Sequence, residues 1–439
     1  MVDHKVSDPS AYTVVMSKGV VLNCHLMYAD CNANNNKFYI IQGLKKSNMY
    51  YLWTRWGRVG VDGQTACQTC MSEDALYKKY HSKMNDKTKK GYNKIEISYE
   101  DVKEEKKQSD KPKKPKKDSQ LHTNVQNLLR FIFDMKAIEK SVVKVGYNAK
   151  KLPLGKLSKK TILNGLSVLK EIEQALKKGS NKQELGRLSS EFYSIIPHDF
   201  KFQHMSNFII DSNSKLKDKL DLVQTLGDIQ IAAEITNEVD DEDDDTNELD
   251  AKYKKMKCKI EPVDEDDKEF DNLVKTVTTT HGSTHHFKIK PLQVFRVVRE
   301  GEAERFKEEI GNKKLLWHGS RFSNWGGILS QGLRIAPPEA PVTGYMFGKG
   351  VYFADIVSKS AQYCCSYLSN NEGILALCEV AIGKHRDLRH ADYNAGNLPA
   401  GCSSTKVTIS NINSCLGSWK MGTNNRSTNR GYKCISWTY

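Results

Sequence analysis

The stretch from Leu315 to Tyr363 constrains this chain most, because its composition differs from that of its surroundings. Charged residues are sparse in it, seven glycines fall within it, and aromatic residues stand beside single polar groups. Glycine allows turns and lets the backbone approach a ligand closely. Apolar and aromatic walls with a few placed polar groups are typical of a ligand pocket, so this composition predicts a pocket and not only a packed core.

One end of this pocket is expected where a buried strand over Leu315–Trp317 ends. His318, Gly319 and Ser320 follow at once, so a ring nitrogen, an open backbone amide and a hydroxyl come from one strand end. Together they offer several hydrogen-bond donors and acceptors to a small polar ligand.

Two tyrosines and a serine further along suit a flat ring that carries an amide. Tyr352 and Tyr363 can face each other across such a ring with Ser360 at its edge, which suits nicotinamide. No GxGxxG fingerprint follows a strand, so a Rossmann cofactor site is excluded. From these residues alone, a pocket for an unspecified ligand remains the alternative.

The charge of the chain favours a polyanionic partner. A net charge of +14 and a pI near 9.0 make nucleic acid the first candidate, with freely solvated lysines as the alternative. The N-terminus has no apolar signal core, and no run of about 18 apolar residues occurs. We therefore expect a soluble chain that is not secreted and has no membrane partner.

Cysteine usage points to a reducing compartment. Eleven cysteines at irregular spacing favour free thiols of the cytosol or nucleus over a disulfide framework. Cys67 and Cys70 form a single CxxC without a second ligand pair, which favours plain thiols over a zinc site.

A length of 439 residues predicts two to four domains, and composition divides the chain further. A small β-rich domain is expected because β-branched and aromatic runs alternate with turn-prone Asn32–Asn36. Its expected elements are strands at Val20–Leu26, Lys37–Gln42 and Met49–Trp56 and a helix at Asp74–Lys83. The expected segments are an N-terminal tail (1–10), the β-rich domain (11–100), a basic linker (101–120), a helical bundle (121–237), an acidic loop (238–250) and a β-rich final domain (251–439).

Four of these segments carry further signals. Trp56 and Arg58 can stack on a base or sugar and pair with a phosphate, although a core tryptophan beside a tight turn is the alternative. The cluster Lys111–Lys117 fits a nuclear-import signal, a phosphate contact or a solvated tether. Ser158 is expected to cap a helix that ends before Gly179. Nine carboxylates between Glu238 and Asp250 predict a solvated, self-repelling loop.

Three histidines, His281, His285 and His286, raise the question of a metal site. No cysteine or carboxylate joins them at ligand spacing, so a structural role is favoured.

Several of these motifs resemble one family. "LLWHGSR", "GLRIAPPEAPVTGYMFGKGVYFAD" and "SKSAQYC" resemble the signature of the DNA-dependent poly(ADP-ribose) polymerases. "RWGRVG" resembles the WGR domain of their shorter members, and "LPLGKLSKKTI" and "FYSIIPHDF" resemble their helical regulatory domain. The resemblance implies a multidomain α+β fold with a WGR-like domain, an all-α regulatory bundle and a mixed α+β ADP-ribosyltransferase domain.

The resemblance also implies an NAD slot. At the nicotinamide end, Gly319 and Ser360 would hold the carboxamide, Tyr363 would stack on the ring, and Tyr352 would form the opposite wall. His318 and Tyr352 are the implied catalytic residues.

At the adenosine end, His318 and Ser320 would bind the ribose and Arg334 the adenine side. The loop from Gly344 to Gly348 would cover the substrate.

The implied function is DNA-break-activated transfer of ADP-ribose in the DNA-damage response. NAD is then a consumed substrate, and no metal is expected. The implied partners are damaged DNA and acceptor proteins, including the chain's own acidic loop. Trp56 and Arg58 are the candidate contacts with DNA or between domains. The implied location is the nucleus, with the helical domain blocking NAD until DNA is bound.

The resemblance ends near the C-terminus. The likeness runs through Leu398–Lys406, a "YNEYIVY"-like segment is absent, and no glutamate follows Glu379. We therefore expect an incomplete catalytic domain, from a truncated isoform or a mispredicted gene end, that lacks its final strands. The resemblance implies a catalytic glutamate in that segment, and losing one preorganised group of this kind costs on the order of 10²–10³ in rate. A DNA-break-binding scaffold and a regulator that holds NAD without cleaving it are the alternatives.

Overall fold

The computed structural model describes residues 2–95, 118–144, 147, 157–237, 246–342 and 345–408, and the backbone of 418–421 and 429–438. The basic cluster at 111–117 and most of the acidic loop lie outside the described residues. Contacts divide the chain into two compact units. The first holds residues 1–112, 142–223 and 339–341, and the second holds 113–141, 224–338 and 342–439. The helical stretch 121–237 is therefore shared between the two units.

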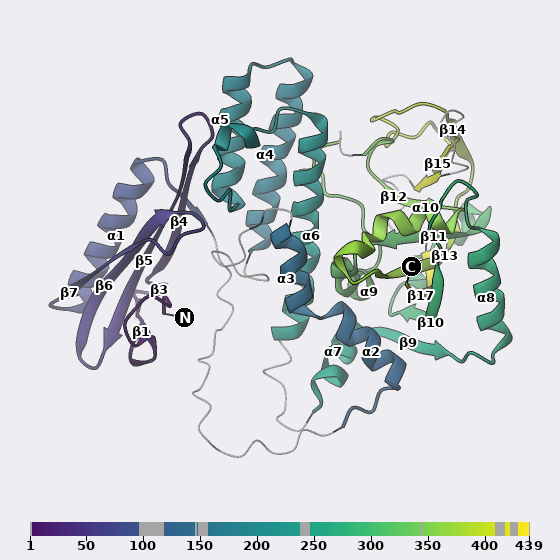
Figure 1. The fold of residues 1–439 in the computed structure, drawn as a ribbon, viewed down its shortest axis with the longest axis horizontal. Coiled ribbons are helices and arrows are strands. Elements are labelled where there is room, and N and C mark those ends of the chain that lie inside the picture. Colours follow the sequence, from purple (N-terminus) through teal and green to yellow (C-terminus); the bar gives the residue numbers. More distant parts are fainter. Residues whose placement is uncertain are drawn as a thin grey trace. The chain divides into compact units, whose positions relative to one another are not determined.

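The first unit contains an antiparallel sheet of strand order β7-β6-β5-β4-β8, with β1 on β5, and a separate β2-β3 hairpin (Figure 1). Asn34, with a left-handed φ of 55°, makes the turn that the asparagine-rich sequence predicts between two of its strands. The strand expected over Val20–Leu26 is divided between two strands, because Leu22 belongs to neither, and the other two expected strands are present and longer than expected. The strands are β1 (Thr13–Val14), β2 (Met16–Ser17), β3 (Val20–Val21), β4 (Asn23–Asp30), β5 (Asn35–Lys46), β6 (Met49–Arg58), β7 (Gln64–Cys70) and β8 (Asn93–Ile95).

Strand alternation gives this sheet two packed faces. Leu52 and its neighbours on one face pack against helix α1 (Glu73–Lys89), which Ser72 caps through the Ala75 amide at 3.2 Å. Trp53, on the other face, packs with Val6 from the N-terminal segment. The helix expected at Asp74–Lys83 is thus confirmed and extends further.

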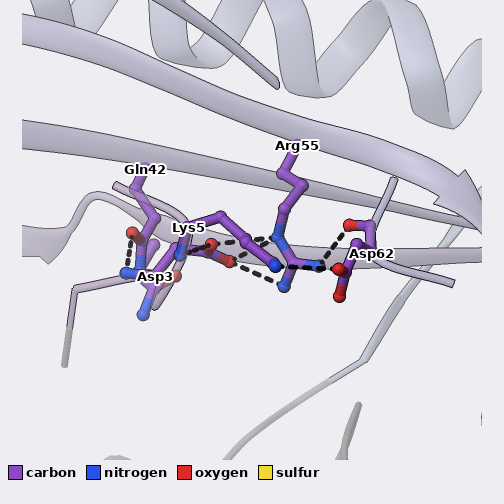
Figure 2. Close-up of polar contacts among 6 residues, drawn as sticks. Asp3, Lys5, Gln42, Arg55 and Asp62 are labelled. Carbon is purple, nitrogen blue, oxygen red and sulfur yellow. Dashed lines mark hydrogen bonds and ion pairs between the residues drawn. The ribbon is translucent and has the colours of Figure 1, made fainter. Parts of the chain in front are cut away.

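The N-terminal segment is not the free tail that we expected. Arg55 Nη2 lies 2.8 Å from a carboxylate oxygen of Asp3, and both side chains are 4% exposed. Gln42 accepts from the Asp3 amide at 2.8 Å, and Lys5 pairs with Asp62 at 2.8 Å (Figure 2). A buried charge of this kind must be paired, so the ion pair fixes the segment on the sheet.

Two helices of the first unit pack on each other, and the second of them packs on β4. They are α4 (Lys159–Lys177), which Ser158 caps at 3.1 Å from the Thr161 amide, and α5 (Lys182–Ile195). Serine hydroxyls of α5 accept from the β4 end, at 3.0 Å between Ser194 Oγ and the Ala29 amide. The capped helix predicted from Ser158 is confirmed.

The second unit is built on a sheet of strand order β14-β15-β16-β12-β11-β13-β17-β10-β9. All neighbours are antiparallel except β14 and β15, which are parallel. The strands are β9 (Cys258–Val263), β10 (Lys290–Arg299), β11 (Lys313–Ser320), β12 (Val351–Ala354), β13 (Glu372–Ala381), β14 (His385–Leu388), β15 (Ser404–Val407), β16 (Ser418–Met421) and β17 (Asn429–Thr438).

Helices cover both faces of this sheet because the side chains of each strand alternate between two cores. Leu316 and Phe295 belong to the core that helices α2 and α9 cover, whereas Trp317 and Val294 belong to the core that α8 and α10 cover. The α-helices with residues in this unit are α2 (Thr123–Ile132), α3 (Met135–Lys144), α6 (Asn213–Asn237), α7 (Glu248–Met256), α8 (Lys268–Thr279), α9 (Trp325–Gln331) and α10 (Val357–Ala361).

One expectation about the final domain was wrong. The chain does not turn β-rich directly after the acidic loop, because Asn247 caps α7 there through the Leu249 amide at 2.9 Å. Beyond Lys406, the described backbone includes two further strands of this sheet. The backbone of β17 pairs with both β10 and β13, with Ile435 opposite Val294 and Leu375, and β16 lies between β12 and β15.

Two further findings bear on function. No helix among the described residues is long and apolar enough to cross a membrane. Within the same residues, no three His, Cys, Asp or Glu side chains are placed to share a metal ion. Both cysteines of the CxxC are free thiols, with Cys67 exposed and Cys70 buried.

Candidate active site

Strand β11 divides the predicted site between the two faces of its sheet. Trp317 faces the α8 and α10 side, and Gly319, two residues on, shares that direction. His318 and Ser320 face the opposite side, where the ring of His318 meets Phe353 edge-on at 5.8 Å. One strand end therefore supplies two different halves of a site.

The nicotinamide half is built from Gly319 and α10. A Cβ atom on Gly319 would lie 2.0 Å from the Ser360 carbonyl oxygen, so no other residue fits at this position. Ser360, which is buried, donates its hydroxyl to the Trp317 carbonyl at 2.9 Å. The structure thus brings Gly319 and Ser360 into direct contact, as the site requires.

The two tyrosines of this half differ in freedom. Tyr363, in the 3₁₀ turn Gln362–Cys364, is 56% exposed, and Lys359 Nζ lies 5.6 Å from its ring centre. Tyr352 is held, because its hydroxyl donates to the Gly348 carbonyl at 2.6 Å and accepts from the Phe347 amide at 3.3 Å. Burial raises the pKa of Tyr352, so its ring stays neutral.

The covering loop is described only in part. Gly344 lies outside the described residues, whereas Gly348 has a φ of 69° that favours glycine. Tyr345, between them, stacks on Tyr352 with ring centres 6.5 Å apart.

His318 has one fixed proton. Its Nδ1 lies 2.9 Å from the Tyr352 carbonyl oxygen, which can only accept, so Nδ1 carries the hydrogen. Burial lowers the pKa of His318, and the ring is therefore neutral at pH 7. Its Nε2 atom keeps a lone pair that can accept from a sugar hydroxyl.

Ser320 is fixed where β11 ends. Its hydroxyl accepts from Asn324 Nδ2 at 3.0 Å, and its carbonyl accepts from Trp325 Nε1 at 3.1 Å. A hydroxyl that accepts in this way keeps its own proton to donate to a ligand.

Helix α6 contacts the adenosine half through residues of the second unit. Asp228 forms an ion pair with Arg334, and Gln224 donates to the Tyr345 hydroxyl. Burial raises the pKa of Asp228 to about 6, although the Arg334 charge opposes the shift. The sequence did not single out Asp228, because its only signal was its place in a helical pattern.

The two predicted DNA residues lie in the first unit, on the face of β6 that α1 covers. The guanidinium of Arg58 donates to the Asn34 carbonyl at 3.1 Å and, at 3.4 Å, to the carbonyl of Lys201. Trp56 stacks on Tyr39 with ring centres 5.6 Å apart. Arg58 therefore links the sheet to the segment that holds Lys201, within the same unit. An interdomain contact was one of the two roles expected for this residue.

Comparison with protein families covers most of the chain. The poly(ADP-ribose) polymerase catalytic domain matches residues 267–428, its regulatory domain residues 119–253, and the WGR domain residues 22–98. The catalytic match continues beyond Lys406, where we expected the likeness to stop.

Individual relatives agree with this. The chain is 44% identical to rice poly [ADP-ribose] polymerase 2-A over 85% of this chain and 59% of the relative. It is 42% identical to the Arabidopsis poly [ADP-ribose] polymerase 2 over 90% of this chain and 66% of the relative. It is 39% identical to the human poly [ADP-ribose] polymerase 2 over 85% of this chain and 67% of the relative. The chain thus spans about three fifths to two thirds of the length of these relatives.

Proposed function

Because this chain belongs to the poly(ADP-ribose) polymerase family, we propose that it transfers ADP-ribose from NAD to protein side chains when it binds a DNA break. The observation that carries the proposal is the close approach of Gly319 to the Ser360 carbonyl, which no side chain at position 319 would allow. The acceptors would be proteins that include this chain, and its place of action would be the nucleus.

In this proposal, the nicotinamide end binds the leaving group. Gly319 and Ser360 hold the carboxamide, and Tyr363 stacks on the ring. The bond between nicotinamide and the ribose carbon breaks, and its electron pair leaves with nicotinamide. An acceptor oxygen then bonds to the cationic ribose carbon and gives up its proton.

The other groups orient the substrate. Nε2 of His318 accepts from an adenosine ribose hydroxyl, and Ser320 donates to the same sugar. Since the proton of His318 is fixed by the Tyr352 carbonyl, the ring needs no reorganisation when NAD binds.

Regulation would act on the adenosine end. NAD needs Arg334 there, but Asp228 of α6 already engages it. We propose that α6 must move for NAD to bind, and that DNA binding favours the moved state.

On the DNA side, Trp56 and Arg58 would contact a break. A phosphate that binds Arg58 must compete with the carbonyls of Asn34 and Lys201. Binding would therefore loosen a contact between the sheet and helical residues of the first unit.

The alternative to this proposal is a DNA-break-binding scaffold with impaired transfer. One experiment separates the two: incubation of the chain with labelled NAD, with and without nicked DNA. Label on the protein only with nicked DNA supports the transferase, whereas tight DNA binding without label supports the scaffold.

The role of the first domain needs its own test. The double variant Trp56→Ala with Arg58→Ala should weaken binding to nicked DNA. Unchanged binding would refute that role, and the exposed Met71→Ala serves as the matched control.

A further inference from the structure

The segment from Thr280 to Phe287, between α8 and β10, carries all three histidines that were weighed as metal ligands and has no part in the proposed chemistry. It lies directly against α10, the helix that supplies Ser360 to the slot. The Thr280 carbonyl accepts from the Val357 amide at 3.0 Å, and the Gly282 amide donates to Ser358 Oγ at 2.9 Å. This segment therefore contacts the helix that supplies Ser360 to the slot.

Helix α10 needs such support. It has five residues, and its N-terminal residue Ile356 makes no side-chain cap. A helix of this length is not stable by itself in water, because the free-energy cost of nucleation exceeds what one turn of hydrogen bonds contributes. Its position must therefore come from tertiary contacts.

One of these contacts joins His285 to Ser358. His285 Nδ1 lies 2.7 Å from Ser358 Oγ, and Ser358 is 0% exposed. The Ser358 oxygen already accepts from the Gly282 amide, so the hydroxyl proton is directed to His285. This arrangement requires a neutral His285 with a lone pair on Nδ1.

The same helix is tied to the slot on its other side. Ser360 donates to the Trp317 carbonyl at 2.9 Å, and Trp317 Nε1 donates to Thr280 Oγ1 at 3.1 Å. These bonds close a ring from the histidine segment through α10 to β11 and back. Because Gly319 has no room to spare against the Ser360 carbonyl, any shift of α10 changes the nicotinamide end.

We propose that His285 is a positioning residue of the nicotinamide end, which holds α10 through Ser358 and releases it when protonated. The inference rests on the proposed function, since it takes the slot to be a nicotinamide site. Protonated His285 would donate to Ser358, whose own buried proton would then lose its acceptor, and such a loss is costly.

The surroundings of His285 keep it neutral at pH 7. Burial lowers its pKa, and the charges of His281, Lys359 and His286 lower it further. The rings of His281 and His285 lie 6.4 Å apart, and Lys359 comes from α10 itself. These are the titratable and charged groups that face His285, and all of them disfavour a second positive charge. The hold on α10 is therefore expected to weaken only under acidic conditions.

The test measures benzamide binding to the full chain by calorimetry, since benzamide is a ring with an amide and needs only the nicotinamide end. His285→Ala should weaken binding about three- to tenfold at pH 7.5, because Ser358 loses its acceptor. His285→Gln offers an amide oxygen in the same place and should restore the affinity. The exposed neighbour gives the matched control, His286→Gln, which should bind as the wild type does.

The pH profile separates positioning from a general loss of structure. Wild-type affinity should fall as the pH drops below the His285 pKa, whereas His285→Gln should give a flat profile. In a double-variant cycle, Ser358→Ala should remove the effect of His285→Ala.

Equal affinity and equal pH profiles for the wild type and His285→Ala would overturn the inference while leaving the slot intact. Failure of the wild type itself to bind benzamide would instead overturn the proposed function.

Discussion

The two ends of the slot start from neighbouring residues of β11 but are completed in different ways. The proposed nicotinamide end lies within one stretch, at Gly319, Ser360 and Tyr363. At the proposed adenosine end, α6 contributes an ion pair between Asp228 and Arg334, residues 106 positions apart. A site can therefore be preformed in one half and covered in the other.

This difference follows from strand alternation. Gly319 faces the side where α10 is locked by buried hydrogen bonds, whereas His318 and Ser320 face the side where α6 packs. In the proposed function, a ligand limited to the first side needs no change in α6. A ligand that spans both sides, such as NAD, would have to compete with Asp228 and Gln224.

The largest expected effect comes from Gly319→Ala, which attacks the preformed end. The new Cβ would lie 2.0 Å from the Ser360 carbonyl, so β11 or α10 must shift. Benzamide binding should fall below detection by calorimetry. The melting temperature of the variant serves as the control, and near-wild-type affinity would show that the end is not tightly built.

The next effect concerns the pH dependence of the covered end. The pKa of Asp228 is raised from 3.8 to about 6, so its contribution to stability is complete below pH 4 and is lost as the pH rises to about 6. Relative to Asp228→Asn, the wild type should lose up to about 3 kcal/mol across this range.

Thermal unfolding of both proteins between pH 4 and 7 measures this difference. Parallel pH profiles would mean that Asp228 is not buried against Arg334. At neutral pH, Asp228 is ionised, so we expect its contact with Arg334 to be released more easily in the wild type than in Asp228→Asn.

A smaller effect is expected from Tyr345→Phe, which removes the acceptor of Gln224 but keeps the ring on Tyr352. Release of α6 should become easier, and a non-hydrolysable NAD analogue should bind about fivefold more tightly without DNA. Benzamide affinity should not change. Tyr393→Phe, at an exposed tyrosine, is the control. Equal gains in affinity for benzamide and for the NAD analogue would contradict the proposed difference between the two ends.

The smallest effect is expected from Tyr363→Phe. Stacking needs the ring and not the hydroxyl, so benzamide affinity should stay within about twofold, whereas Tyr363→Ala should lose about tenfold. Calorimetry checks both. A large loss in the phenylalanine variant would give the hydroxyl a role that the structure does not suggest.

Local sequence patterns predicted much of the fold. Alternation and the Asn32–Asn36 turn located β4, β5 and β6, and Ser158 located the start of α4. Contacts between distant segments could not be predicted in this way. The Asp3–Arg55 ion pair and the place of β17 between β10 and β13 both depend on partners far along the chain.

The site shows the same limit. Gly319, Ser360 and Tyr363 could be predicted because one glycine-rich stretch contains them. Asp228 could not, because a single carboxylate in a helix looks solvated until its partner is known. A structural role was expected for the histidines, but the link from His285 to Ser358 was not, because its two residues lie 73 positions apart.

The most direct test compares two affinities of the full chain, for benzamide and for a non-hydrolysable NAD analogue, with and without nicked DNA. If α6 covers only the adenosine end, nicked DNA should raise the affinity for the NAD analogue about tenfold or more and leave that for benzamide unchanged. An equal change in both affinities, or no change in either, would contradict the account.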